Sequence, residues 1–237
     1  MALDTSLHAR AAATGSAFLR FYRWDPSCLS FGRHEPALKR YDRQKITSLG
    51  LDTVRRPTGG RAVWHAAELT YAVAAPEAAM GSLRRAYQRI HETIAAGIQA
   101  LGAPVTLAPA RPGVPLDAGA CFSAAAGGEV VLNAGKVAGS AQLRHEGALL
   151  QHGSILLDDD QSMIRQLTAR PSPLPDVRPL SRILGRPVPW DEVAAAIAGA
   201  ARAWSEEWIV LEDEAPLLAD AARCSARYRD PAWTWQR

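Results

Sequence analysis

The sequence predicts an α+β fold in which helices flank mixed or antiparallel sheets. Segments with the two-residue periodicity of strands come in clusters with helical segments between them, rather than in strict alternation. The composition, 48% apolar and 22% charged over 237 residues, is that of a chain with a buried core. From this length we expect one domain over residues 1–237, with a helical carboxy-terminal part from about residue 178.

The first 50 residues predict two helices with two strands between them. Residues 3–13 are rich in Ala and Leu and predict a helix that begins near Asp4, a residue type that caps helices. The alternating side chains of residues 17–24 indicate a strand, and residues 27–31 indicate a shorter one. A helix is expected over residues 37–49, because the glycine that follows is the usual helix terminator.

The next segment predicts three strands and the clearest helix of the chain. Short strands are expected at 52–56 and 61–65, around a Pro-Thr-Gly-Gly turn, and another at 68–75. The helix covers residues 80–101. Its apolar residues share one face at helical spacing: Leu83, Tyr87, Ile90, Ile94, Ile98 and Leu101.

The second half begins with a proline-containing loop at 105–117 and ends in helices. Three further strands are expected, at 129–133, 136–144 and 148–157, with a hairpin connection between the first two. Four prolines between positions 171 and 179 predict a connecting loop. The last two helices are expected at 190–208 and 215–228.

Charge and cysteine usage exclude several classes of protein. A formal net charge of +3 without a run of Lys or Arg does not predict a nucleic-acid partner. No apolar stretch is long enough for a membrane span, and the first residues lack the layout of a signal peptide, so we expect a soluble, cytoplasmic protein. Cys28, Cys121 and Cys224 have spacings that predict neither a disulfide framework nor a metal site.

A turn between two predicted strands carries the first candidate site. Residues 55–63 read RRPTGGRAV. The glycine pair permits close backbone approach with exposed amide groups, and the arginines add donors for anionic or carbonyl oxygens. A hairpin turn with solvated arginines fits this spacing equally well, because it is neither a P-loop nor a dinucleotide fingerprint.

Two further features carry chemistry. Residues 135–142 (GKVAGSAQ) leave one strand face bare of large side chains, so that a ligand can lie against it. Lys136 in this strand is one of only three lysines among 27 basic residues, which suggests a need for a compact ammonium, although chance also explains one lysine. Cys121 lies in a loop of small residues, where a thiol near a cation can act as a nucleophile. Cys28 and Cys224 are interpreted as structural.

Together these segments resemble the lipoate/octanoate ligase and transferase superfamily. RRPTGGRAVWH at 55–65 and ELTY at 68–71 are similar to its first signature, and GKVAGSAQ at 135–142 with LQHGSIL at 150–156 to its second. Within the superfamily the chain is most similar to octanoyltransferases of the LipM type, through the Ala-Cys-Phe motif at Cys121 among other features. The resemblance extends over nearly the whole chain and implies the class II biotin/lipoate-ligase-like fold.

The resemblance implies an acyltransferase without a metal or other cofactor. Cys121 would take octanoate from octanoyl-acyl carrier protein as a thioester and pass it to a lysine of a lipoyl-domain protein or glycine-cleavage H protein. Lys136 would hydrogen-bond the acyl carbonyl and favour the thiolate. The implied substrate-binding set is Arg55, Arg56, Thr58, Gly59, Gly60, Arg61, His65, Gly139, Ser140, Ala141, Gln142, His152 and Gly153.

Two alternatives stay open at this point. A lipoate–protein ligase would use ATP and Mg on the same scaffold with the same lysine, and would not need the cysteine. A non-catalytic acyl-binding module would bind octanoyl groups without turnover. Biotin ligase is disfavoured, because no biotin-type glycine-rich signature is present.

The chain departs from the family pattern after the motif histidine. The family has an aspartate there, and Ala66 in its place removes an expected hydrogen-bond partner of His65. Glu68 and Tyr71 are interpreted as structural. His145 and His152 are placed outside catalysis, because strand histidines are most often packed, with His152 as support for the pocket floor.

Overall fold

The computed structural model describes residues 1–109, 127–133, 135–170 and 176–236. Its centre is a four-stranded antiparallel sheet of order β1-β5-β10-β9. The strands are β1 (Phe18–Tyr22), β5 (Glu68–Pro76), β9 (Ala138–His145) and β10 (Ala148–Leu156). Three of them agree closely with the predicted strands. The long β5 and β10 pair along their whole length, and nearly all of their residues are buried.

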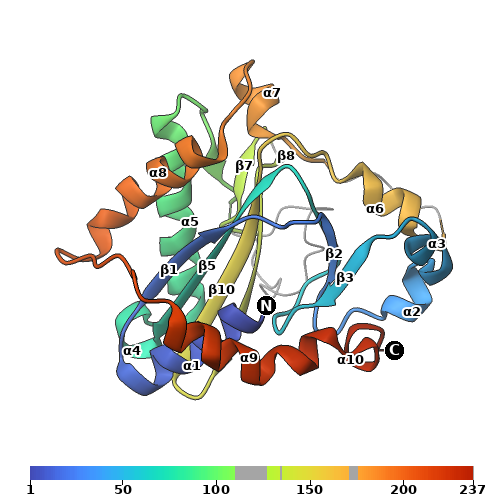
Figure 1. Cartoon of the computed structure of the whole chain (residues 1–237). Helices are drawn as coiled ribbons and strands as arrows, with labels where there is room; N and C mark the ends of the chain where they lie inside the picture. The colour runs from blue at the N-terminus through green and yellow to red at the C-terminus, as the bar shows by residue number, and fades with distance from the viewer. Residues whose placement is uncertain (110–126, 134, 171–175, 237) are drawn as a thin grey trace.

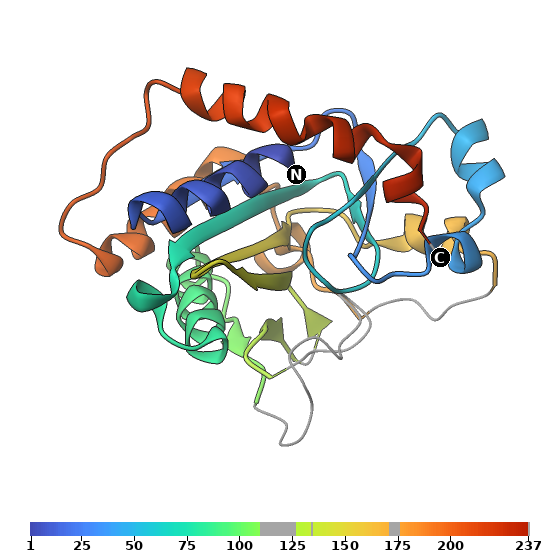
Figure 2. The same ribbon diagram turned by 90° about the horizontal axis from the view of Figure 1, so that it is seen from below.

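Helices cover both faces of this sheet (Figures 1 and 2). Helices α1 (Ala2–Thr14) and α9 (Ala215–Arg229) lie on one face. On the other face lie α5 (Leu83–Ala100), which follows the short α4 (Glu77–Met80), and α8 (Trp190–Ala201), which continues into a 3₁₀ turn (Arg202–Trp204). Side chains alternate across β5, so Leu69, Tyr71, Val73 and Ala75 belong to the core with α5, and Ala72 and Ala74 pack against α1.

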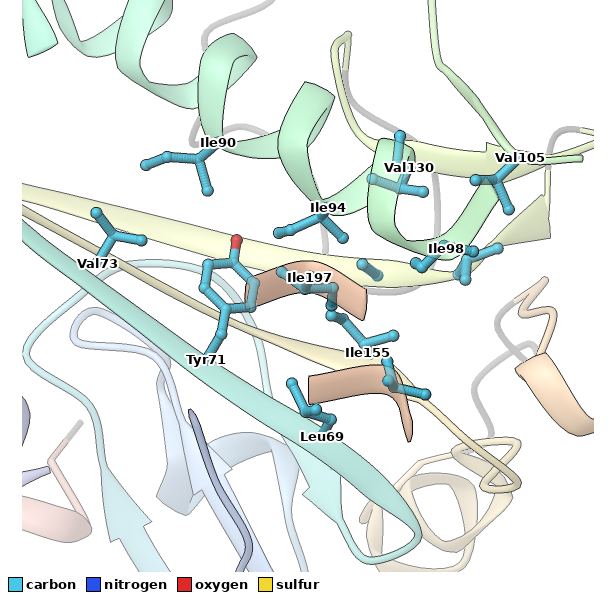
Figure 3. Packing of buried hydrophobic residues seen from close by; sticks show 14 of the residues in the cluster. Leu69, Tyr71, Val73, Ile90, Ile94, Ile98, Val105, Val130, Ile155 and Ile197 are labelled. Carbon is cyan, nitrogen blue, oxygen red and sulfur yellow. The ribbon is translucent and has the colours of Figure 1, made fainter. Parts of the chain in front are cut away.

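The larger core lies between α5, α8 and the sheet. Figure 3 shows Ile90, Ile94 and Ile98 of α5 facing Tyr71 of β5 and Ile197 of α8. The predicted apolar helix face is therefore confirmed by its burial. The two helices approach closely at Gly97 of α5, where an added Cβ would meet the Ile197 Cα at 2.8 Å.

Two smaller sheets complete the fold. One has the order β3-β2-β4, with β2 (Cys28–Phe31) parallel to β3 (Asp52–Arg55) and antiparallel to β4 (Val63–His65). Beside it lie the short helices α2 (Ala37–Arg40), α3 (Arg43–Ser48), α6 (Ser162–Leu167) and α10 (Pro231–Thr234). The other comprises β6 (Thr106–Leu107), β7 (Val130–Leu132) and β8 (Gly135–Lys136), and α7 (Leu180–Leu184) follows later in the chain. This mixture of parallel and antiparallel strands with flanking helices confirms the predicted α+β class.

The structure corrects several predicted boundaries. The single helix expected at 37–49 is two helices, because Tyr41 is extended and forms a bridge with Thr168, and Asp42 then caps α3. The strand expected at 136–144 divides at Val137, so that β8 and β9 belong to different sheets. The helix expected to start near residue 190 ends at Ala201 rather than at position 208.

Asp4 was expected to cap the first helix and does not. It lies inside the first turn of α1, fully buried, and the helix begins after Met1 without a side-chain cap.

Among the described residues, none of the helices combines the length and apolar character that a bilayer crossing requires.

Arg55 joins the second sheet to the end of the chain. Its guanidinium is fully buried and directed at six backbone carbonyl oxygens. Three belong to the turn after β2, at Gly32, Arg33 and Glu35, and three to residues 233, 234 and 236 at the end of the chain. Only the planar five-donor fork of arginine serves so many acceptors.

Replacement Arg55→Lys is therefore expected to lower the free energy of unfolding by about 3 kcal/mol, because several buried carbonyls lose their donor. Urea denaturation measures this loss. The control Arg229→Lys changes an exposed arginine and is expected to shift stability by at most about 0.5 kcal/mol. Equal free energies of unfolding for the two variants would show that the hydrogen bonds of the Arg55 guanidinium do not stabilise the fold.

Candidate active site

A cavity lies where the central sheet meets the second sheet, at the amino-terminal end of α1, and its empty space of about 300 Å³ includes open solvent. The cavity is lined by Met1, Tyr22, Trp24, Arg56, Val63, His65, Thr70, Gly139, Ser140, Ala141, His152, Gly153 and Ser154. Seven of the predicted substrate-binding residues are among them.

Small residues of β9 and β10 form one wall of the cavity. Gly153 of β10 pairs with Ser140 of β9 on one side and with Tyr71 of β5 on the other. A Cβ at position 153 would meet the Gly139 carbonyl oxygen at 2.5 Å and Tyr71 Cε1 at 2.8 Å, as well as the Ser140 hydroxyl. No larger residue therefore fits at this position without displacing its neighbours.

The first polar cluster behind the cavity contains Asp4, His152 and Thr58. The Asp4 carboxylate accepts hydrogen bonds from Arg20 at 2.9 Å, from Tyr22 at 2.9 Å and from His152 Nδ1 at 3.1 Å. Because Nδ1 of His152 donates, its Nε2 accepts from the Thr58 hydroxyl, 2.5 Å away. The chain of bonds fixes the tautomer of His152 and holds the Gly59–Gly60 turn against β10.

Burial and neighbouring charges shift the pKa values of this cluster in opposite directions. Burial alone raises the pKa of the Asp4 carboxyl, but the amino terminus, His152 and Arg20 hold that pKa well below its usual range. Burial lowers the pKa of His152, against the opposing effect of Asp4. At neutral pH the cluster is thus an ionised carboxylate beside a neutral imidazole.

A second cluster of the same kind surrounds His65. Arg56 donates to the Ser30 hydroxyl at 2.5 Å, which leaves that hydroxyl to donate to His65 Nε2, also at 2.5 Å. Nδ1 of His65 then donates to Glu68 at 2.6 Å. Trp24 stacks on the imidazole with ring centroids 4.3 Å apart. The Ser154 hydroxyl lies 3.3 Å from the same Nδ1. The ring of His65 is therefore held by other side chains, although Ala66 does not supply the partner that an aspartate would.

A third network lies beneath the small-residue wall. His91 of α5 bonds through Nδ1 to the Gly128 carbonyl at 2.8 Å, so Nδ1 carries the proton and Nε2 accepts from Ser140, also at 2.8 Å. Ser140 in turn accepts from Tyr71 at 2.6 Å, and Gln151 donates to Tyr71 at 2.9 Å. Burial lowers the pKa of His91 to about 4, with a further contribution from the charge of Lys136. The ring is therefore neutral at physiological pH.

Lys136 lies outside the cavity lining and is buried in an ion pair. Its ammonium is 2.8 Å from Glu129, and both side chains are almost fully buried. Tyr87 donates to the other oxygen of Glu129 at 3.3 Å and stacks edge-on against His91. This pair is thus linked through His91 to Ser140 in the cavity wall.

The structure separates the remaining predicted residues into groups. Arg55 and Thr58 lie behind the cavity, Gly59 and Gly60 form the partly exposed turn, and Arg61 is exposed. Gln142 donates to Gln151 and to the Leu83 carbonyl, away from the cavity.

The predicted nucleophile, Cys121, lies outside the described residues. Of the other cysteines, Cys28 is buried, and burial raises the pKa of its thiol to about 12. Cys28 therefore remains protonated at neutral pH, as expected of a structural residue. Cys224 is half-buried against α1, where Ser6 lies 3.9 Å from its sulfur.

Four functional candidates were missed or given a smaller role in the sequence analysis. Asp4 was interpreted as a cap, Glu68 as structural, and His91 and Glu129 were not singled out. His91 could have been noticed as the only histidine in the long apolar helix. Glu129 follows two glycines and carries no distinctive local signal, because its partner Lys136 is reached only through the fold.

Acidification tests the neutral state of His91. In the unfolded chain this imidazole returns to the ordinary histidine pKa of 6.5, against about 4 in the folded protein. Between these values the unfolded state binds the proton and the folded state does not, so stability falls as the pH falls, by at most about 1.4 kcal/mol per pH unit. Urea unfolding at pH 7, 6 and 5 is therefore expected to weaken less in His91→Gln than in the wild type.

The matched control is His145→Gln, whose ring is exposed, with 66% of its side chain accessible. This variant is expected to follow the wild type. If the pH dependence of His91→Gln also equals that of the wild type, the proposed neutral, buried state is wrong.

The chain is similar to proteins of one family. A family model described as the lipoyl protein ligase A/B catalytic domain matches residues 1–202. Octanoyltransferase LipM of Exiguobacterium sibiricum is 35% identical in an alignment 246 residues long. The alignment covers 92% of this chain and 87% of the relative. Octanoyltransferase LipM of Symbiobacterium thermophilum is 38% identical over 223 residues, which cover 86% of this chain and 81% of the relative.

Solved structures give the same result for the fold. The structure of a lipoate-protein ligase A bound with ATP superposes with a TM-score of 0.78 at 20% identity, covering 99% of this chain and 92% of that one. A lipoate protein ligase from T. acidophilum with bound lipoic acid gives 0.79 at 20% identity, covering 99% and 91%. These likenesses confirm the predicted ligase-like fold. The chain belongs to the lipoyl protein ligase A/B catalytic-domain family, and it is an acyltransferase of that family.

Proposed function

We propose that the protein transfers an octanoyl group from octanoyl-acyl carrier protein to a lysine of a lipoyl-accepting protein, through a thioester on Cys121. The observation that carries this proposal is the cavity. It has a wall of small residues, and burial of each methylene of an acyl chain contributes about 0.8 kcal/mol. The names of the relatives support octanoyl as the group transferred.

The chemistry balances in two steps. The Cys121 thiolate attacks the thioester carbonyl, a new carbon–sulfur bond forms, and the carrier leaves as a thiolate that takes up a proton. The acceptor amine then attacks the acyl-cysteine, a carbon–nitrogen bond forms, the carbon–sulfur bond breaks, and the amine proton passes to solvent as Cys121 is released. Thioester exchange is nearly isoenergetic and amide formation is downhill, so the reaction needs neither ATP nor a metal.

Lys136 is the proposed electrostatic partner of this chemistry. Its ammonium is held by Glu129 in a buried pair, and a charge in such surroundings acts more strongly than in water. The role proposed for it is to stabilise the oxyanion that develops on the acyl carbonyl and the Cys121 thiolate.

The acceptor is proposed to be a lipoyl domain or the glycine-cleavage H protein. One solved structure with the fold of this chain is that of an archaeal lipoate protein ligase, which was analysed together with its E2 lipoyl domain. A ligase acting on free octanoate with ATP is the competing activity, and dependence on ATP separates the two.

The test is incubation with octanoyl-carrier protein and measurement of the intact mass. The wild type is expected to gain one octanoyl group that hydroxylamine removes, as a thioester requires. Cys121→Ala is expected to form no adduct, and Cys224→Ala, the control cysteine, is expected to form it normally. Lys136→Met is expected to form the adduct about 100-fold more slowly, the usual effect of losing one oxyanion donor.

Two results would overturn the assignment. An octanoyl adduct that persists in Cys121→Ala would exclude this residue as the nucleophile. Modification of a lipoyl domain by free octanoate, dependent on ATP and retained in Cys121→Ser, would establish the ligase activity instead.

A further inference from the structure

The wall of small residues brings one hydroxyl group to the cavity. Ser140 of β9 is half-buried, and it lines the cavity together with its neighbours Gly139 and Ala141. A hydroxyl group has one proton to donate and two lone pairs with which to accept. A polar group on a bound acyl chain can therefore receive a hydrogen bond from Ser140 only if that proton points toward the cavity.

The buried ring of His91 determines where the Ser140 proton points. Its Nδ1 lies 2.8 Å from the Gly128 carbonyl oxygen, which can only accept, so Nδ1 carries the ring proton. Nε2 is then an acceptor, and the Ser140 oxygen lies 2.8 Å from it. Burial lowers the pKa of this ring to about 4, so the ring is neutral and Nε2 accepts at neutral pH. His91 belongs to α5 and is not among the described residues of the cavity lining, so the proton is directed behind the wall.

The hydrogen bonds on the other side of Ser140 have the same direction. Tyr71 donates to the Ser140 oxygen at 2.6 Å, and the Tyr71 oxygen accepts from the amide of Gln151 at 2.9 Å. The carbonyl oxygen of Gln151 accepts in turn from Gln142 at 2.8 Å, which fixes the orientation of the Gln151 amide. Without His91 as an acceptor, Tyr71 would still donate to Ser140. Among the contacts of the described residues, the Ser140 proton would then have no acceptor behind the wall and would turn toward the cavity.

Two other hydroxyl groups of the lining are also directed into the protein. Tyr22 donates to the buried carboxylate of Asp4, and Thr70 donates to that of Glu68. A carboxylate holds such a donor firmly, because charge-assisted hydrogen bonds are stronger than neutral ones. The acceptor of Ser140 is a neutral imidazole instead. His91 is therefore a position at which an uncharged substitution changes the polarity of the wall without removing a buried charge.

We propose that His91 is a positioning residue that makes the cavity select unsubstituted alkyl chains over acyl chains that carry a keto group. This inference rests on the proposed function, and it names a class of acyl group that the same site rejects. A keto oxygen only accepts hydrogen bonds, and it loses those from water when it enters the cavity. Because the Ser140 proton is directed to His91, this hydroxyl supplies none in return. An alkyl chain has no hydrogen bonds to lose, so only the keto chain is disfavoured.

The test measures the rate of formation of the acyl adduct by intact mass, with a carrier protein loaded with octanoyl, 5-oxooctanoyl or 7-oxooctanoyl groups. In both oxo chains the keto group is too far from the thioester to change its reactivity. The quantity compared is the ratio of second-order rate constants, octanoyl over oxooctanoyl, because the folded fraction of a variant cancels in it. The wild type is expected to give ratios of about 10 to 100. In His91→Leu the ratio is expected to fall about 10-fold for at least one oxo chain.

Three variants separate this role from a general loss of packing. His91→Gln keeps a side-chain carbonyl to accept from Ser140 and an amide to donate to Gly128, so the wild-type ratio is expected. Ser140→Ala in the His91→Leu background removes the redirected hydroxyl and is expected to restore the preference for octanoyl. His145→Leu is the matched control, because it makes the same replacement at an exposed ring, and it is expected to keep the wild-type ratio.

Several results would each overturn the proposal. They are a ratio near one in the wild type, unchanged ratios in His91→Leu, the same fall in His91→Gln or His145→Leu, and a fall that persists after Ser140→Ala. If the wild type forms no adduct with octanoyl-carrier protein, the proposed function itself fails, and that failure is seen before any ratio is measured.

Discussion

The buried carboxylate of Asp4 is the interaction on which the arrangement of the site depends. It belongs to α1, accepts hydrogen bonds from Arg20 and Tyr22 of β1, and accepts another from His152 of β10. Through His152 it also positions Thr58 in the glycine turn. A fully buried anion is tolerated only when it is paired and hydrogen-bonded. Its three donors therefore hold the helix, the sheet and the turn in one geometry.

The same principle explains how a cavity lined by polar residues can hold an apolar chain. Tyr22 and His152 donate to Asp4, Thr70 donates to Glu68, and Ser140 donates to His91. These donors are directed into the protein, where buried acceptors satisfy them. The alkyl chain proposed to bind here would therefore not have to break those hydrogen bonds.

The charged groups inside the molecule are paired. Each described carboxylate near the site has a cation or an imidazole within hydrogen-bond distance: Asp4 with Arg20 and His152, Glu68 with His65, and Glu129 with Lys136. Because a buried charge is tolerated only with a partner, each pair fixes the position of the two segments that supply it.

The sequence by itself determined the fold class, the apolar face of α5, the strands β5 and β10 and the family, since periodicity and signature motifs are local in the chain. It also singled out Lys136 and the small-residue strand. Only the tertiary structure decided which residues meet. From the sequence Asp4 is predicted to cap a helix, but the fold brings it to His152. Ala66 removes one expected hydrogen-bond partner of His65, but the fold supplies Glu68 and Ser30 as partners instead. These partners are set by strand register and by helix packing on the sheet, which depend on contacts between distant segments that no local pattern records.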